Sequence, residues 1–301
     1  MLFVLSLKER TIFPMFLRRC KFALVCLALA LPGCDDAART VASLFSPGRP
    51  PALAPVTLPA RPVRPKACCR ALARVLEAAV TEDGLADANR LRGRQGDLDE
   101  QIHLLAVTGP TATPGLFPTA EARAAYWLNA RAAWSLKLWL DANCPARIAP
   151  EALVGRSFPL DGGRRTLAGI DRALHDEMGW RAVVAAPGVG LDRAALPREP
   201  FCADGVGQVV RARIDAFVTD EARFAIDIER KQVRVPPVLW RFEREILREH
   251  RQRGGTDGKV TLRDFLLLHL GHAPRKRLQD ALGYEMVEAR YDKGVRCVPA
   301  P

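Results

Sequence analysis

One stretch of the chain, residues 119–143, constrains the fold more strongly than any other. Its sequence, TAEARAAYWLNARAAWSLKLWLDAN, predicts the longest helix beyond the N-terminal region, with Thr119 as the N-cap residue and Asn143 followed by Pro145 at its end. On a helical wheel one arc is polar and the opposite arc is apolar. The polar arc holds Glu121, Arg123, Arg131, Ser135, Lys137 and Asp141, and the apolar arc holds Ala122, Ala125, Ala133, Leu136 and Leu140. We therefore expect the downstream elements to pack around this helix.

Asn129 is the one polar side chain in the middle of the apolar arc. A buried amide must find hydrogen-bond partners, or it costs about 1–3 kcal/mol. The alanines one turn away on either side, Ala125 and Ala133, would let another segment of backbone come close enough to supply them. We therefore predict that Asn129 ties its helix to an adjacent loop or strand. A direct functional role is the alternative.

The composition is that of a globular protein with an excess of positive charge. The chain has 301 residues, of which 49% are hydrophobic and 26% charged, and its net charge is +11. We expect one folded domain of about 200 residues or slightly more. The arginines are spread along the chain and form no basic patch interleaved with aromatic residues, so no specific nucleic-acid partner is expected. A surface that binds polyanions is an alternative.

The N-terminal region is typical of a bacterial lipoprotein signal. Met15 begins a cleaner signal than Met1 does, with positive residues followed by an apolar run at 22–31 that is too short to span a bilayer comfortably. Leu31-Pro32-Gly33-Cys34 resembles a lipobox, which implies cleavage before Cys34 and lipidation of that cysteine. The protein would then be held at a membrane of the cell envelope, facing the periplasm or the exterior. An uncleaved anchor or an ordinary signal peptide is the alternative.

The chain therefore divides into a signal peptide at 1–33, a linker at 34–66 and a globular domain at 67–301. The linker begins with the lipid-attachment residue Cys34, and its repeated prolines favour an extended, disordered tether. Within the domain, apolar periodicity predicts helices near 72–79, 98–106, 166–178, 206–218, 240–250 and 262–270. Strands are predicted around the turn at 161–163, at 182–186, in a hairpin formed by 224–228 and 233–235, and at 286–291. The fold class is α+β, a predominantly helical single domain around a small β-sheet.

The order of these elements resembles the bacterial domain-of-unknown-function family 547 (DUF547). Tyr126-Trp127-Leu128-Asn129-Ala130 is similar to part of that family's F-W-I-N-x-Y-N-A signature. The segment that ends at Asp171 is similar to its L-x-D-I-E helix, and the segment around Trp240 is similar to its L-S-x-I-F-x-W-Y segment. The resemblance marks Trp127, Asn129, Asp171 and Trp240 as signature residues and covers roughly 79–297.

The chain departs from the family where chemistry would be expected. The histidine of the family's D-I-E-H is Arg172 here, and residues 183–191 lack the Asn and Cys of its A-L-N-C segment. The resemblance therefore implies a member that has lost a nucleophile and a histidine. The first hypothesis is a non-catalytic binding or scaffolding domain for an unknown envelope protein or ligand.

A cysteine-type hydrolase or transferase with a displaced nucleophile is the alternative hypothesis. Cys202 with His175 is the one catalytic pair we name, because a nucleophilic thiol needs a nearby base. Some of the cysteines are expected to form disulfides in an oxidising envelope, and the candidates are Cys68, Cys69, Cys144, Cys202 and Cys297. His269 and His272 lack further ligands at metal-binding spacing, so no metal is expected. No phosphate-binding loop is present, so no cofactor is expected.

Overall fold

The computed structural model describes residues 69–148, 153, 155–220, 225–254, 260–270, 272–289 and 294–298. The chain divides into two compact units, Met1–Pro51 and Ala52–Pro301, and all described residues belong to the second. The expected signal peptide, the lipidated Cys34, the linker and Cys68 lie outside the described residues. Among the residues that are described, no helix is both long enough and apolar enough to cross a membrane.

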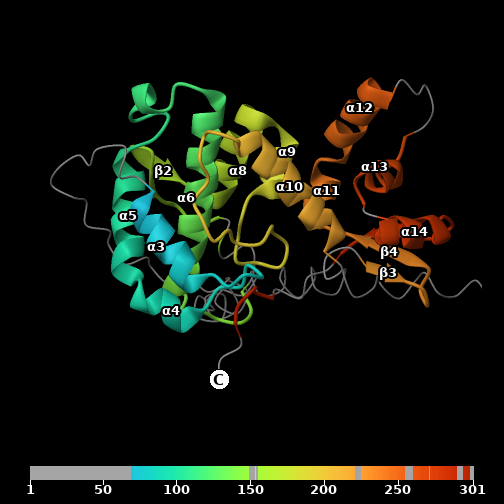
Figure 1. Cartoon of the computed structure of the whole chain (residues 1–301), viewed down its shortest axis with the longest axis horizontal. Helices are drawn as coiled ribbons and strands as arrows, with labels where there is room; N and C mark the ends of the chain where they lie inside the picture. Colours follow the sequence, from blue (N-terminus) through green and yellow to red (C-terminus); the bar gives the residue numbers. More distant parts are fainter. Residues whose placement is uncertain are drawn as a thin grey trace, which may run out of the picture. The chain divides into compact units, whose positions relative to one another are not determined.

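The predicted long helix is α6 (Ala120–Asp141), and it lies among the helices from α3 to α10 (Figure 1). It contacts α5 (Gln95–Val107), α8 (Leu167–Met178), α4 (Ala88–Gly93) and α10 (Val206–Thr219). As predicted, Thr119 caps it, accepting a hydrogen bond of 3.1 Å from the backbone N–H of Ala122. The helix ends at Asp141, and Asn143 follows in a left-handed conformation (φ 66°).

The polar arc of α6 is not exposed to solvent in its middle turns, because Arg131, Ser135 and Lys137 are buried. Neighbouring elements enclose the helix from residue 124 to residue 139, so the polar side chains are paired instead of solvated. The Lys137 ammonium, for example, lies 3.0 Å from carboxylate oxygens of both Asp99 and Asp141. A wheel shows which residues share a face, but it does not show whether a second layer covers the polar face.

Shorter helices extend this core on both sides. α3 (Arg70–Ala79) buries Leu72, Val75, Leu76 and Ala79 and contacts both α4 and α5. Between α5 and α6 lies a single 3-10 turn, η2 (Pro114–Leu116). The predicted helices at 166–178 and 206–218 are α8 and α10, and Thr166 caps α8 through the backbone N–H of Gly169.

The expected strand at 182–186 is wrong, because residues 182–185 lie in helix α9 (Trp180–Ala185) and Ala186 is its C-cap. Gly179, with φ 71°, turns the chain out of α8, and α9 then packs against both α8 and α10. Its apolar residues are buried on every side, so the segment shows no helical alternation of apolar and polar residues. A short apolar run of this kind fits a buried strand and a buried helix equally well.

The strands in the described residues form two small sheets rather than one. β1 (Phe158–Leu160) and β2 (Gly163–Arg165) form the predicted hairpin, with Asp161 and Gly162 at positive φ in its turn. β3 (Ala225–Asp227) pairs antiparallel with β4 (Gln232–Val235), as predicted, although Phe224 lies outside the described residues. β5 (Glu285–Glu288) joins β4 in parallel. The class is α+β, and a helix, not a sheet, occupies its centre.

The C-terminal part contains more helices than predicted. The expected helix at 240–250 is divided into α11 (Pro237–Arg241) and α12 (Glu243–Gly254), with Phe242 between them. α13 (Leu262–His269) is the helix predicted near 262–270, and it begins with a capping box formed by Thr261 and Asp264. α14 (His272–Asp280) was not predicted, because its sequence has no apolar stripe: among the side chains described there, Leu278 is the one that is buried, and Ala281 follows after the helix.

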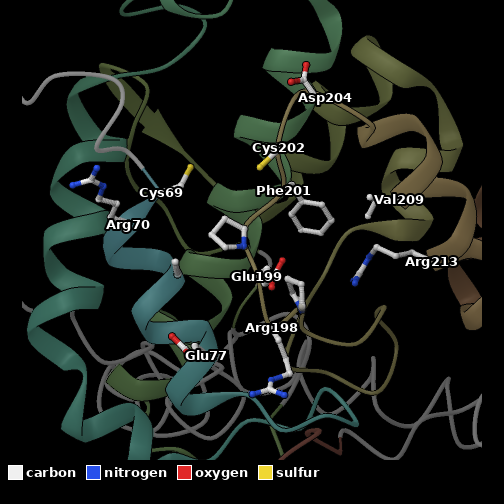
Figure 2. Close-up of a pocket in the computed structure, with 13 residues that line it drawn as sticks. Cys69, Arg70, Glu77, Arg198, Glu199, Phe201, Cys202, Asp204, Val209 and Arg213 are labelled. Atoms are coloured by element: carbon white, nitrogen blue, oxygen red, sulfur yellow. The ribbon is translucent and has the colours of Figure 1, made fainter.

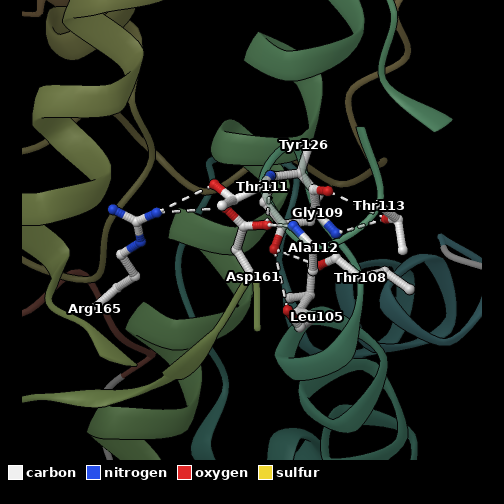
Figure 3. A network of polar contacts seen from close by, with 9 residues as sticks. All are labelled: Leu105, Thr108, Gly109, Thr111, Ala112, Thr113, Tyr126, Asp161 and Arg165. Carbon is white, nitrogen blue, oxygen red and sulfur yellow. Dashed lines mark hydrogen bonds and ion pairs between the residues drawn. The ribbon is translucent and has the colours of Figure 1, made fainter. Parts of the chain in front are cut away.

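Asp161 holds the loop between α5 and α6 in place (Figure 3). Its carboxylate oxygen Oδ1 accepts hydrogen bonds of 2.8 Å from the backbone N–H groups of Thr111 and Ala112. Its own backbone N–H donates to the carbonyl of Leu105. The Tyr126 hydroxyl, on α6, lies 2.8 Å from the carbonyl oxygen of Thr108 in the same loop. This hairpin turn therefore fixes the entry of the chain into α6.

Candidate functional site

Asn129 makes two hydrogen bonds to the backbone of one residue, Phe201. Its Nδ2 donates to the Phe201 carbonyl at 2.9 Å, and its Oδ1 accepts from the Phe201 N–H at 2.8 Å. The side chain is 3% exposed, and the flanking residues Ala125 and Ala133 are buried. This is the expected tie between α6 and a loop. The side-chain amide of Asn129 thus pairs with the backbone of Phe201 as a peptide group of a neighbouring strand would.

Beside Phe201 lies a groove of about 1130 Å³ (Figure 2). One side is a face of α3 from Arg70 to Glu77, and the other is the loop at 197–204 together with α10. The groove is lined by Cys69, Arg70, Ala73, Glu77, Pro197, Arg198, Glu199, Pro200, Phe201, Cys202, Asp204, Val209 and Arg213. Its lining thus combines apolar side chains with charges of both signs.

Arg213 fixes the side of the Phe201 loop that faces α10. Its Nε donates to the Ala185 carbonyl at 2.8 Å, and its Nη2 donates to the Ala195 carbonyl at 2.5 Å. Its guanidinium also lies 5.3 Å from the centre of the Phe201 ring, in cation–π contact. Burial lowers the pKa of Arg213 to about 10, so the side chain stays protonated near neutral pH. The phenyl ring and the backbone of Phe201 are therefore held by different helices.

A buried ion cluster supports the preceding part of the same loop. Arg131 Nε donates to Asp171 Oδ1 at 2.7 Å, and Arg193 Nη2 lies 3.0 Å from Asp171 Oδ2. The second contact has the distance of an ion pair but not the angles of a hydrogen bond, so Oδ2 has no hydrogen-bond partner within the described residues. Burial opposes ionisation of Asp171, yet the two guanidinium groups outweigh it and hold the pKa of Asp171 below its usual range.

Gly188 allows the loop to approach this cluster. A Cβ atom there would lie 2.9 Å from Arg193 Cγ and 3.0 Å from Arg193 Cβ. The backbone N–H of Gly188 donates to the carbonyl of Ala194, which closes a short loop around Arg193. Asp171 therefore anchors residues 187–196 through Arg193.

The structure places Cys202 and His175 in different surroundings. Cys202 is exposed and lines the groove, and no histidine is among the residues that line it. His175 is on α8, where its Nε2 lies 2.8 Å from Glu245 Oε2 and its ring stacks on Phe242 at 5.5 Å. The groove has instead a second cysteine, Cys69, whose sulfur lies 3.8 Å from Asn129 Nδ2. In Figure 2 both cysteine sulfurs lie at the same end of the groove.

The remaining named residues lie apart from the groove lining. Trp127 is buried in the core, with the Arg165 guanidinium 5.7 Å from its ring centre, and Trp240 packs partly buried against the core. His269 lies 3.7 Å from Asp215, and burial lowers the pKa of this histidine. His272 is exposed at the start of α14. Among the described residues, no group of three or more His, Cys, Asp or Glu side chains is placed to hold a metal ion.

Sequence reasoning missed Phe201, Arg213, Arg131 and Arg193. The useful signal for Phe201 was Pro197 and Pro200 just before it, which keep the chain out of regular structure. The arginines gave no comparable signal, because they are three among many in an arginine-rich chain.

No family model matches the chain, and neither does any curated protein or solved structure.

Proposed function

We propose that the chain is a lipid-anchored bacterial envelope protein whose domain binds an extended polypeptide segment in the groove without catalysing a reaction. The lipobox-like sequence that ends at Cys34 supports the anchor and the location. The contact between Asn129 and Phe201 carries the binding proposal. The Asn129 amide fixes the wall of the groove at Phe201, and a fixed wall reduces the entropy lost when a ligand binds.

The size and lining of the groove favour a polypeptide over a compact ligand. Small-molecule sites usually enclose about 300–1,000 Å³ and are mostly apolar. This groove, at about 1130 Å³, is larger, and its lining mixes charges of both signs with apolar residues. Arg70 and Arg198 can bind carboxylates, Glu77 and Glu199 can bind basic side chains, and Phe201 can pack against apolar ones.

Recognition in the groove would use side chains and not added strand pairing. Pro197 and Pro200 have no backbone N–H, and both polar backbone groups of Phe201 are bonded to Asn129. This wall therefore offers no free sheet edge to a bound strand. Specificity would come from the spacing of charged and apolar residues in the ligand.

Selection from a random peptide library on the immobilised full-length chain tests the proposal. Val209 is 44% exposed in the groove, and Leu282 is 64% exposed and not part of the groove lining, so Val209→Glu and Leu282→Glu form a matched pair. Selected peptides should bind the wild type and Leu282→Glu equally and lose at least about tenfold in affinity with Val209→Glu. Failure to select any peptide sensitive to Val209→Glu contradicts the proposal. An affinity that is the same in both variants as in the wild type but falls steeply with salt favours the polyanion alternative.

Cysteine-type hydrolysis or transfer is the second candidate function. The observation that favours it is the exposed thiol of Cys202 in the groove, although the lining supplies no imidazole. It requires turnover of an ester, amide or thioester that disappears in Cys202→Ser. Equal rates for the wild type and this variant remove it.

A further inference from the structure

The C-terminal segment at 294–298 binds three parts of the chain through its backbone. The Val295 N–H donates to the Ala146 carbonyl at 3.0 Å, just after the end of α6. The Arg296 N–H donates to the Val189 carbonyl at 2.7 Å, in the loop that leads to the groove. The Val298 N–H donates to the Ala86 carbonyl, just before α4. This short segment therefore connects the ends of elements that are far apart in the sequence.

The pairing beyond the end of α6 brings two cysteines into the same region. Arg147 and Gly294 form an antiparallel bridge, and the Val295 N–H donates to the Ala146 carbonyl, so the two segments lie side by side. Cys144 comes two residues before Ala146, in a left-handed conformation (φ 54°), and Cys297 comes two residues after Val295. Each cysteine is therefore two residues from a paired position, and a disulfide needs their Cα atoms to lie about 4.4–6.8 Å apart.

The surroundings of the two thiols agree with this placement. Both cysteines are partly buried and pack against the same apolar core. Burial raises the pKa of both thiols, and the pKa of Cys144 is also raised by the nearby Cys297 and lowered by Arg92. A raised pKa slows the reaction of a thiol, which is usual for structural cysteines and not for catalytic ones.

We propose that Cys144 and Cys297 form an intramolecular disulfide by exchange with a disulfide oxidant. The thiolate of one cysteine attacks a sulfur of the oxidant, whose S–S bond breaks to give a mixed disulfide and one thiolate. The other cysteine thiolate then attacks the protein sulfur of the mixed disulfide and displaces the second thiolate. The two cysteines lose two protons and two electrons, and the oxidant leaves as two thiols. The bond fastens the C-terminal segment to the end of α6.

Thiol mapping on the full-length chain tests the proposal. The protein, purified in reductant, is equilibrated with excess oxidised glutathione, treated with N-ethylmaleimide and digested for mass spectrometry. We expect a linked pair of peptides that carry Cys144 and Cys297, with Cys202 accessible to reagent as an exposed thiol. The same linked pair should form in Cys202→Ser. Separate modification of Cys144 and Cys297 by glutathione or maleimide, or linkage of either to another cysteine, overturns the proposal.

A thermal measurement gives an independent readout. The disulfide closes a loop of more than a hundred residues, so the oxidised wild type should melt roughly 5–15 °C above the reduced protein. This difference should vanish in Cys297→Ser and persist in Cys202→Ser. An equal difference in all three proteins would assign the effect to another cysteine pair and overturn the proposal. Neither thiol mapping nor thermal unfolding depends on ligand binding in the groove. Failure of the disulfide proposal can therefore be told apart from failure of the peptide-binding proposal.

Discussion

The amide of Asn129 makes both hydrogen bonds of a peptide group to the backbone of Phe201, 72 residues further along the chain. The Asn129 side chain is fixed by α6, the most enclosed helix of the described fold, so the position of Phe201 follows from the position of that helix. The groove wall is thus set by the core and not by the loop itself. This relationship explains why a polar residue occupies an apolar face.

Asn129→Leu should destabilise the protein by about 2–4 kcal/mol, because it leaves the N–H and the carbonyl of Phe201 without their partner. Asn129→Asp should also destabilise it, because a carboxylate accepts from the N–H but repels the carbonyl. Urea unfolding monitored by tryptophan fluorescence measures both. Asn89→Leu, at an exposed helix position, is the control and should change stability by less than about 0.5 kcal/mol. Unchanged midpoints in both Asn129 variants would contradict the structural role.

Sequence patterns predict the local elements of this fold better than they predict the long-range contacts between them. The caps at Thr119 and Thr166, the hairpin turn at Asp161 and the position of α6 all depend on residues close in sequence. The burial of Arg131 depends on Asp171 and Arg193, which come from α8 and a loop. A local sequence pattern does not show which distant residues will contact a side chain.

The candidate site was predictable only in part, for the same reason. Asn129 was identifiable because a polar residue interrupts an apolar face, which is a local anomaly. Cys202 was named for its chemistry, and its exposure in the groove depends on how the loop at 197–204 lies against α3. Arg213 is a polar residue on a mostly polar helix face, and its two carbonyl partners lie in other elements.

Asp171→Asn should destabilise the protein by about 3–5 kcal/mol at neutral pH, because Arg131 and Arg193 remain buried without the carboxylate. The pKa of Asp171 is lower in the folded than in the unfolded protein. The contribution of ionised Asp171 to stability is therefore complete above the pKa of about 3.9 in the unfolded protein. It is lost as the pH falls towards the lower pKa in the folded protein. The difference in unfolding free energy between the wild type and Asp171→Asn should shrink below about pH 4.

Urea unfolding at several pH values between neutrality and the acid range measures this difference. Asp176→Asn is the matched control, since Asp176 lies on the same helix with an exposed side chain. It should have little effect at any pH. A wild-type minus Asp171→Asn difference that is constant down to the acid range would contradict the ion-pair explanation.

Arg213→Lys should loosen the groove wall while keeping the positive charge. A lysine ammonium cannot donate to the carbonyls of Ala185 and Ala195 with the forked geometry of a guanidinium. We expect a loss of about 1–3 kcal/mol in stability and faster hydrogen exchange at the amides around Phe201. Exchange measured by mass spectrometry, with the exposed Arg211→Lys on the same helix as control, checks this. Identical exchange in the two variants would show that Arg213 does not hold the wall.

Gly188→Ala tests whether the loop at 187–196 is in close contact with the buried ion cluster. The added methyl group would lie within 3.0 Å of Arg193, whose side chain is buried and paired with Asp171, so it has little freedom to move. We expect a loss of about 1–3 kcal/mol from overpacking. Gly96→Ala, in α5 with nothing near the new methyl group, is the matched control and should raise stability by about 0.5–1 kcal/mol. Thermal unfolding of the two variants gives shifts of opposite sign if Gly188 is needed for the close approach, and shifts of the same sign if it is not.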